Sequence, residues 1–251
     1  MIALITGVTS GIGKASAEIF AKNKYDLIIT GRRNDRLDKL ADELKKKYGI
    51  KVLPLNFDVR KQKEVEKNLS LLTPGWRKID VLLNNAGLAS GFDTIQEGNI
   101  EDWEAMIDTN IKGLLYVTRQ IAPMMIENGK GHILNVASLA GKQAYPKGNV
   151  YCATKFAVDA LSQSMRIDMI EHGIRVTNIA PGLVETEFSV VRFHGDKDRA
   201  KQTYAGFQPL TPDDIADIIF WCASRPAHVN INDILITPTA QANAYIVNRK
   251  S

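Results

Sequence analysis

The chain has 251 residues, of which 45% are hydrophobic and 24% are charged, and its formal net charge is +4. This composition is typical of an ordinary globular protein and excludes a disordered or fibrous chain. The apolar runs are shorter than the ~20 residues that a membrane-spanning helix needs, and two cysteines cannot form a disulfide framework. The basic residues are scattered and lack interleaved aromatic residues, so nothing supports nucleic-acid binding. We expect one domain over residues 1–251, without a membrane or nucleic-acid partner, in a reducing cytoplasm.

The apolar pattern predicts alternating strands and helices along the chain. Short runs rich in isoleucine, leucine and valine predict strands at 2–6, 26–30, 51–55, 79–83, 131–136, 174–179 and 232–236. Helical spacing predicts helices at 12–23, 34–48, 61–72, 101–127, 150–171 and 212–223. Continuous apolar runs indicate strands buried on both faces, hence a parallel sheet, and the alternation favours a doubly wound α/β fold of about seven strands. The stretch 184–206 is the least regular, and we expect it to cover the substrate because it follows a strand end.

A glycine-rich turn, Thr6-Gly7-x3-Gly11-Ile12-Gly13, joins the first predicted strand to the first helix. A helix N-terminus offers unpaired N–H groups and a partial positive charge, which favour phosphate. Glycines let the backbone approach a pyrophosphate without a Cβ clash. The spacing differs from the usual Gly-x-Gly-x2-Gly dinucleotide fingerprint, so an ordinary strand-to-helix turn remains the alternative.

The second predicted strand ends in two arginines, Arg32 and Arg33, and no acidic residue stands between Leu27 and Arg33. At this place an acidic side chain holds the ribose hydroxyls of NAD, whereas an arginine accommodates the 2′-phosphate of NADP. The arginine fork of donors suits a phosphate. The pattern therefore favours NADP, with two solvated arginines as the alternative.

A tyrosine and a lysine, Tyr151 and Lys155, stand four residues apart on a predicted helix, and Ser138 precedes them. Residues four apart share a helix face. A tyrosine loses its proton near pH 10, and a nearby cation lowers that pKa. Ser138 and Tyr151 can then act on one carbonyl or hydroxyl oxygen, as a redox site needs. By itself this pattern also fits a chance pair with a solvated lysine.

These motifs, in this order, resemble those of the short-chain dehydrogenase/reductase family. Besides the residues above, the resemblance rests on Asn84-Asn85-Ala86-Gly87, Asn110 and Pro181-Gly182-x3-Thr186. It implies a Rossmann-like fold, with Tyr151 as acid/base, Ser138 polarising the substrate oxygen and Lys155 binding the nicotinamide ribose. Asn110 matches a residue that holds water in a proton relay, and a buried side chain that bonds the helix backbone is the alternative.

The resemblance also implies the cofactor contacts. The turn residues Gly7, Thr9, Ser10, Gly11, Ile12 and Gly13 would surround the pyrophosphate. Asp58 and Val59 would contact the adenine, and Asn85 and Gly87 would lie close to the adenosine ribose. Val184 and Thr186 would hold the carboxamide of the nicotinamide. Asp58 and Thr186 could instead be only helix caps. The four histidines lack metal-ligand spacing, so no metal is expected.

The substrate prediction rests on departures from the common family pattern. Ile236-Thr-Pro-Thr replaces the usual acidic residue and glycine pair, and with Phe188–Phe193 it resembles NADP-dependent 3-hydroxy acid dehydrogenases, which oxidise serine or allo-threonine. A carboxylate needs a cation, and Arg192 is the favoured candidate. Gln143 and Asn149 are polar candidates beside Ser138 and Tyr151.

Three alternatives remain open at this stage. A general carbonyl reductase or a 3-oxoacyl reductase would keep the chemistry, and an acyl-carrier partner would use a basic patch formed by Lys142, Lys147 and Lys197. A dinucleotide-sensing regulator without turnover is the most distant alternative. The resemblance further implies a homotetramer, or else a homodimer, packed through 101–127 and 150–171, with the tail 241–251 lying on a neighbour.

Overall fold

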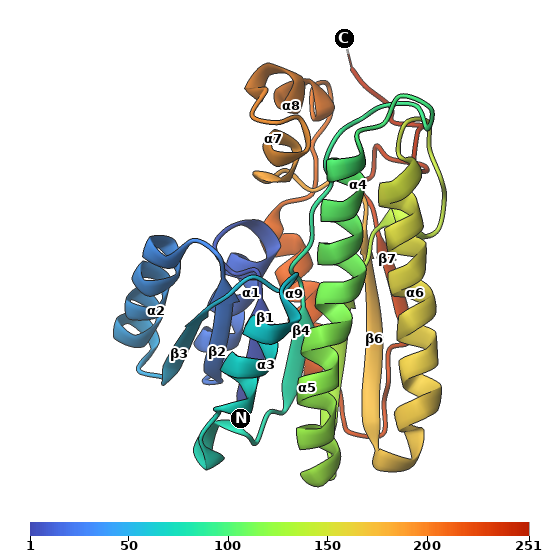
Figure 1. The fold of residues 1–251 in the computed structure, drawn as a ribbon. Coiled ribbons are helices and arrows are strands. Elements are labelled where there is room, and N and C mark those ends of the chain that lie inside the picture. Colours follow the sequence, from blue (N-terminus) through green and yellow to red (C-terminus); the bar gives the residue numbers. More distant parts are fainter. Residues whose placement is uncertain (251) are drawn as a thin grey trace.

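The computed structural model describes residues 1–250, which form a seven-stranded sheet covered by helices on both faces (Figure 1). All neighbouring strands are parallel, in the order β3-β2-β1-β4-β5-β6-β7. The strands are β1 (Ile2–Thr6), β2 (Asp26–Gly31), β3 (Val52–Asn56), β4 (Val81–Asn84), β5 (Gly131–Val136), β6 (Ile174–Pro181) and β7 (Asp233–Ile236). The predicted doubly wound fold is confirmed, and every predicted strand is present.

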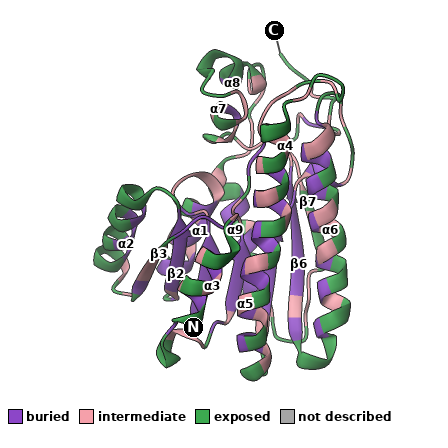
Figure 2. Cartoon of the chain, in the orientation of Figure 1, coloured by how far each residue is buried: buried purple, intermediate pink, exposed green. Residues whose placement is uncertain are grey.

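The sheet has a hydrophobic core on each face, which explains the continuous apolar runs. Leu4 packs into one core and its neighbour Ile5 into the other, because successive strand residues point to opposite faces. One face is covered by α1 (Gly11–Lys22), α2 (Asn34–Tyr48) and α9 (Pro212–Ala223), and the other by α3 (Gln62–Ser70), α5 (Leu114–Glu127) and α6 (Asn149–Met169). The sheet and the inner helix faces are buried in Figure 2, and the outer faces are exposed.

The strand order reverses between β1 and β4. From β1 the chain builds outward to β2 and β3, then returns and builds the other way from β4. In doubly wound sheets the ligand crevice lies at the carboxyl ends of the strands at such a switch point. The glycine turn after β1 and the Asn84–Gly87 motif after β4 therefore meet there.

The helix predicted over 101–127 is interrupted, which corrects the prediction. It divides into α4 (Ile100–Ile107), a π-helical turn η2 (Asp108–Gly113) and α5. Gly113 in this turn packs so closely on Val59 that an added Cβ would lie 2.8 Å from the valine Cγ2. Such turns occur frequently at functional sites, and this one contains Asn110.

The cover segment, residues 184–206, is more regular than its sequence predicts. It contains two short helices, α7 (Phe188–Arg192) and α8 (Lys197–Thr203), which stand above the carboxyl edge of the sheet (Figure 1). The tail packs on this segment of its own chain: Arg249 donates to the carbonyls of Thr203 and Ala205, and the Lys250 N–H donates to Gly206. The tail therefore has contacts within its own chain, and its packing on a neighbouring subunit stays a prediction.

Within residues 1–250, every helix is too short or too polar to cross a membrane.

Candidate active site

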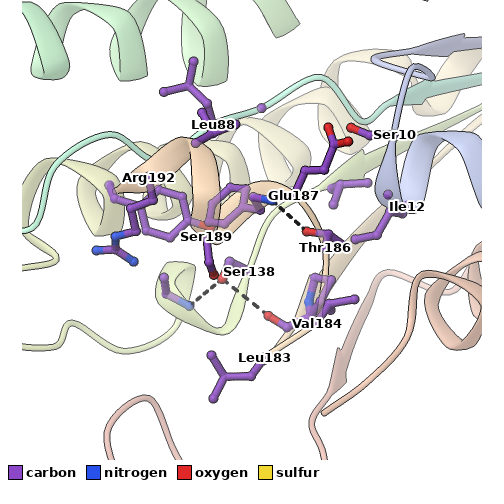
Figure 3. Close-up of a pocket in the computed structure, with 18 of the residues that line it drawn as sticks. Ser10, Ile12, Leu88, Ser138, Leu183, Val184, Thr186, Glu187, Ser189 and Arg192 are labelled. Carbon is purple, nitrogen blue, oxygen red and sulfur yellow. Dashed lines mark hydrogen bonds between the residues drawn. The ribbon is translucent and has the colours of Figure 1, made fainter. Parts of the chain in front are cut away.

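A crevice of about 930 Å³ opens at the carboxyl ends of β1, β2, β4, β5 and β6. Its walls come from the glycine turn, the end of β2, the loop after β4, the start of α6 and the cover segment. Figure 3 shows Ser138 at its centre, with Glu187 and Arg192 projecting from the cover segment. The volume is near the upper end of the range for small-molecule and cofactor sites.

The glycine turn has the shape that a pyrophosphate requires. Gly7 and Gly11 have φ angles of +73° and +54°, in the left-handed region that favours glycine. A Cβ on Gly13 would lie 2.4 Å from the Gly7 oxygen and from Asn85 Nδ2. The Asn85 amide donates to the oxygens of Thr6 (2.8 Å) and Gly7 (3.1 Å), so it fixes the turn from the neighbouring strand. The turn places the N-terminus of α1, which has no acidic residue in its first turn, against the crevice.

The arginine at the end of β2 supplies the cation that the glycine turn itself lacks. Arg33 Nε donates to Thr9 Oγ1 (3.0 Å), and Nη2 donates to Ser10 Oγ (2.9 Å). Both hydroxyls accept from the guanidinium and keep their own protons for a phosphate oxygen. This arrangement fits a phosphate on the adenosine ribose.

Arg32 and Asp58 lie next to this phosphate site. Arg32 Nη1 is 3.8 Å from Asp58 Oδ2, and its side chain is 55% exposed. Asp58 is held by Arg60, whose Nη2 lies 2.6 Å from Oδ2 and whose backbone N–H donates to Oδ1. The carboxylate thus organises its own turn but does not cap α3, whose N-cap is Lys61, and both Asp58 and Val59 line the crevice.

Tyr151 and Lys155 lie on one face of α6 and are both buried. Lys155 Nζ is 5.9 Å from the centre of the Tyr151 ring and donates to the Val136 oxygen (2.9 Å). Ser138 Oγ accepts from the Ala140 N–H (3.1 Å), and a hydrogen bond from Ser138 favours the ionised form of Tyr151. The structure brings the three predicted residues together.

The pKa of Tyr151 runs against the simple expectation. Burial raises the pKa of Tyr151 well above its ordinary value, and the hydrogen bond from Ser138 and the charge of Arg192 only partly offset this. Burial also lowers the pKa of Lys155 to about 8. In the cofactor-free protein desolvation thus outweighs the groups that favour the phenolate, and the lowering of the Tyr151 pKa by Lys155 together with the nicotinamide stays a prediction. The positive charge of a bound oxidised nicotinamide would act with the lysine to lower the pKa of Tyr151.

The lysine pKa predicts how cofactor affinity depends on pH. Below about pH 8 Lys155 is an ammonium and favours an anionic cofactor, and above that pH the charge is lost. NADPH affinity should fall several-fold as the pH rises from about 7 to about 9, measured by fluorescence titration. By linkage, bound NADPH should raise the pKa of Lys155. The Lys155→Met variant should show a flat profile over the same range, and an equal decline in that variant would contradict the assignment.

The side chain of Asn110 connects three elements. Its amide donates to the Leu88 oxygen (2.8 Å) and to Thr154 Oγ1 (3.0 Å), and its Oδ1 accepts from the Leu88 N–H (2.9 Å). Both amide protons are therefore used within the protein. The side chain thus holds η2 against the loop after β4 and against α6, and its backbone partner is Leu88 of that loop, not the helix backbone of the alternative.

The remaining predicted cofactor residues line the same crevice, namely Ile12, Gly87, Val184 and Thr186. Gly87 lies close to Asn110 and Lys155. A Cβ at this position would lie 3.3 Å from Asn110 Oδ1 and 3.5 Å from Lys155 Nζ, so the absence of a side chain leaves room for both groups. Thr186 Oγ1 accepts from the Phe188 N–H (3.1 Å) and so fixes the turn before α7, whose N-cap is Glu187 and not Thr186.

Among the predicted substrate residues, only Arg192 joins Ser138 and Tyr151 in the crevice. Its Nη1 donates to the Tyr145 hydroxyl (2.8 Å), and its guanidinium carbon lies 5.6 Å from the centre of the Tyr151 ring. The structure does not support the other two candidates. Gln143 accepts from the Ala244 N–H of the tail, and Asn149 donates to the Asp93 oxygen outside the main crevice.

Two aromatic residues of the site, Tyr145 and Phe188, were not predicted as site residues from the sequence. Tyr145 holds Arg192, and the Phe188 ring lies 5.7 Å from the Tyr151 ring. The position of Tyr145 between Ser138 and Tyr151 was the only feature of the sequence that pointed to it. Nothing in the sequence separated it from the other polar residues of that stretch.

Fold and crevice together define a dinucleotide-dependent oxidoreductase. The family pattern described as "short chain dehydrogenase" matches residues 1–196, and the chain belongs to this family. The chain is 48% identical over 245 residues to the NADP-dependent 3-hydroxy acid dehydrogenase YdfG of Salmonella typhi, covering 97% of each chain. It is 45% identical over 248 residues to an NADP-dependent 3-hydroxy acid dehydrogenase of Schizosaccharomyces pombe, covering 98% of this chain and 96% of the relative.

Two solved structures of serine dehydrogenase are also similar. The closed form complexed with NADP+ matches with a TM-score of 0.94 and 44% identity, covering all of both chains. The enzyme from Escherichia coli matches with a TM-score of 0.84 and 40% identity, covering 96% of this chain and all of that one.

Proposed function

We propose that this protein is an NADP-dependent oxidoreductase that interconverts a small 3-hydroxy acid, such as serine or allo-threonine, with its 3-oxo acid or semialdehyde. The names of the full-length relatives support the reaction class. The observation that carries the substrate class is Arg192, a cation placed beside Tyr151 in the crevice. A neutral alcohol would leave this charge without an anionic partner.

The chain's own groups have separate roles in the proposed reaction. In the oxidation, Tyr151 takes the hydroxyl proton and Ser138 holds the same oxygen. In the reduction, Tyr151 returns that proton to the developing alkoxide. Lys155 holds the nicotinamide ribose hydroxyls beside the phenol. Bound NADP+ or NADPH supplies the hydride acceptor or donor.

The guanidinium of Arg192 is oriented before any substrate binds. Nη1 is held by Tyr145 and Nε by the Gly91 oxygen (3.3 Å), whereas Nη2 has no hydrogen-bond partner among residues 1–250. The Phe92 ring lies 4.7 Å from the guanidinium carbon and shields it from water. A partly desolvated donor of this kind binds a carboxylate more strongly than a solvated lysine does.

The substrate assignment can be tested by removing the charge of Arg192. The Arg192→Met variant should lose about 100-fold in kcat/KM for serine or 3-hydroxybutyrate, because hydrogen bonds to charged groups contribute about 1.5–3 kcal/mol each. A neutral alcohol of similar size should change little. Steady-state NADPH absorbance measures both, and Arg192→Lys tests whether charge without the fork suffices. An equal loss on both substrates would contradict the assignment.

One observation weighs against a 3-oxoacyl reductase with an acyl-carrier partner. Lys142 Nζ lies 2.7 Å from Asp159 Oδ1 and 3.0 Å from Asp233 Oδ2, so its charge is neutralised within the chain. This weakens the basic patch that such a partner would need. A regulator without turnover would need no arginine beside Tyr151. Turnover of 3-hydroxy acids but not of acyl thioesters is the expected result of a substrate panel.

We also propose a cytoplasmic homotetramer, with a homodimer as the alternative. Apolar side chains are exposed along α5 and α6, among them Leu115, Phe156 and Ile167, with exposed fractions of 37%, 44% and 74%. Such faces favour a partner of the same kind. Light scattering distinguishes the two assemblies.

A further inference from the structure

A carboxylate of the cover segment reaches across to the arginines that follow β2. Glu187 Oε2 lies 2.8 Å from Arg33 Nη1, and Oε1 lies 2.9 Å from Arg36 Nη1. The partners are more than 150 residues apart in sequence. The hydrogen bond from Arg33 lowers the pKa of Glu187 below its ordinary value, so the group is ionised at neutral pH. The proposed function gives this ion pair no role.

The ion pair spans the crevice above the glycine turn. Thr186, next to Glu187, packs on the turn so closely that a Cβ on Gly11 would lie 3.2 Å from its Cγ2. On the opposite side Arg33 is tied to Thr9 and Ser10 of the same turn. Figure 3 shows the Glu187 carboxylate beside Ser10. A dinucleotide lying along the turn would therefore pass beneath this link.

The same segment also carries the substrate-facing arginine. Helix α7 runs from Phe188, the residue after Glu187, to Arg192. At its far end the Arg192 oxygen accepts from the Gly91 N–H (3.0 Å). The ion pair anchors one end of the helix, and Arg192 at the other end meets the crevice. A short helix that is held at both ends restricts the position of Arg192 more than a helix that is held at one end.

We propose that Glu187 is a positioning residue: it clasps the cover segment to Arg33 and Arg36, closes the crevice over the bound cofactor and fixes Arg192 for the substrate. The proposal rests on the NADP-dependent function proposed above. It deepens that function by linking the arginine at the 2′-phosphate site to the one at the substrate site.

The geometry favours a clasp over an anion that competes with the cofactor phosphate. Arg33 uses Nη1 for Glu187 but Nε and Nη2 for the turn hydroxyls, which lie on another edge of the guanidinium. A phosphate that accepts from the Thr9 and Ser10 hydroxyls on that side leaves Nη1 to the carboxylate. Arg36, the second partner of Glu187, is not among the residues that line the crevice. The Glu187 carboxylate therefore lies beside the 2′-phosphate site and does not occupy it.

The test is the rate of cofactor release from the Glu187→Gln variant. Stopped-flow fluorescence should show NADPH leaving about three- to tenfold faster than from the wild type, the range expected for a half-exposed ion-pair network. NADH should be released faster by a similar factor, because the clasp acts on closure and not on the 2′-phosphate. The KM for a 3-hydroxy acid should rise by a similar factor, with kcat within about twofold.

Matched variants separate the clasp from general damage. Glu185→Gln removes the same charge from the same segment at an exposed residue and should leave release unchanged. Arg36→Gln removes one partner without touching the crevice and should give an intermediate rate. High salt should bring the wild type towards the Glu187→Gln rate.

The opposite results would overturn the clasp. Slower NADPH release from Glu187→Gln, with NADH unaffected, would make the carboxylate a competitor of the phosphate. Unchanged release of both cofactors would leave Glu187 without a role in closure. Cofactor release is measured without substrate, so it tests the clasp even if the wild type turns over no 3-hydroxy acid, which would refute the proposed function separately.

Discussion

Replacing Tyr151 by phenylalanine should lower kcat by about 10²–10⁴-fold, the range that positioned acid/base groups contribute. The ring would keep its place against Phe188, because the change removes only the hydroxyl. Removing the buried Tyr151 hydroxyl leaves Ser138 with its hydrogen bonds from the Ala140 N–H and to the Pro181 oxygen and creates no large cavity. NADPH affinity should therefore stay within about twofold of the wild type.

Single-turnover kinetics with prebound NADPH measures this effect on the chemical step alone. Tyr145→Phe is the matched control, since it also removes one phenol hydroxyl from the crevice, at a partly buried residue. Its hydroxyl holds Arg192 (2.8 Å), so its loss should raise KM and spare most of kcat. Retained turnover in Tyr151→Phe would remove that residue from the acid/base role.

The second large effect is expected at Arg33, on the choice of cofactor. Arg33→Ala should weaken NADPH binding by about 100-fold and NADH binding by only a few-fold, because a phosphate–guanidinium contact contributes about 1.5–3 kcal/mol per hydrogen bond. NADH carries no 2′-phosphate to lose that contact. Isothermal titration with both cofactors gives the ratio directly.

The control for Arg33 is its neighbour Arg32, which is 55% exposed and lies 3.8 Å from Asp58. Arg32→Ala should weaken NADPH binding less than Arg33→Ala does, because only Arg33 bonds the turn hydroxyls. An equal loss of NADPH and NADH in Arg33→Ala would instead indicate that the glycine turn had collapsed.

The charge network around Arg33 shows that a cation can reach the glycine turn from outside the glycine motif. The glycine turn contains Thr9 and Ser10 and no basic residue between Gly7 and Gly13. In the structure Arg33 lies over both hydroxyls and brings the missing cation to the turn. The same charge arrives from the next strand because β1 and β2 are parallel neighbours.

The burial of Tyr151 and Lys155 is the second property that the local sequence pattern did not predict. The spacing of Tyr151 and Lys155 predicted their shared face correctly, since helix geometry alone sets it. Their pKa values depend on what packs around α6, and there burial raises one and lowers the other. The same limit applies to Gln143 and Asn149, whose partners in the tail and in the loop at Asp93 are remote in sequence.

The amino-acid sequence by itself determined the strands, the main helices other than the division at η2, the glycine turn and the Ser138–Tyr151–Lys155 group. Periodicity, glycine conformation and helix spacing act within a few residues, so these features can be read locally. Only the tertiary structure decided that the cover segment forms α7 and α8, that Glu187 meets Arg33, and that Arg192 is held by Tyr145. These contacts join residues brought together by the path of the whole chain, and no local pattern encodes that path.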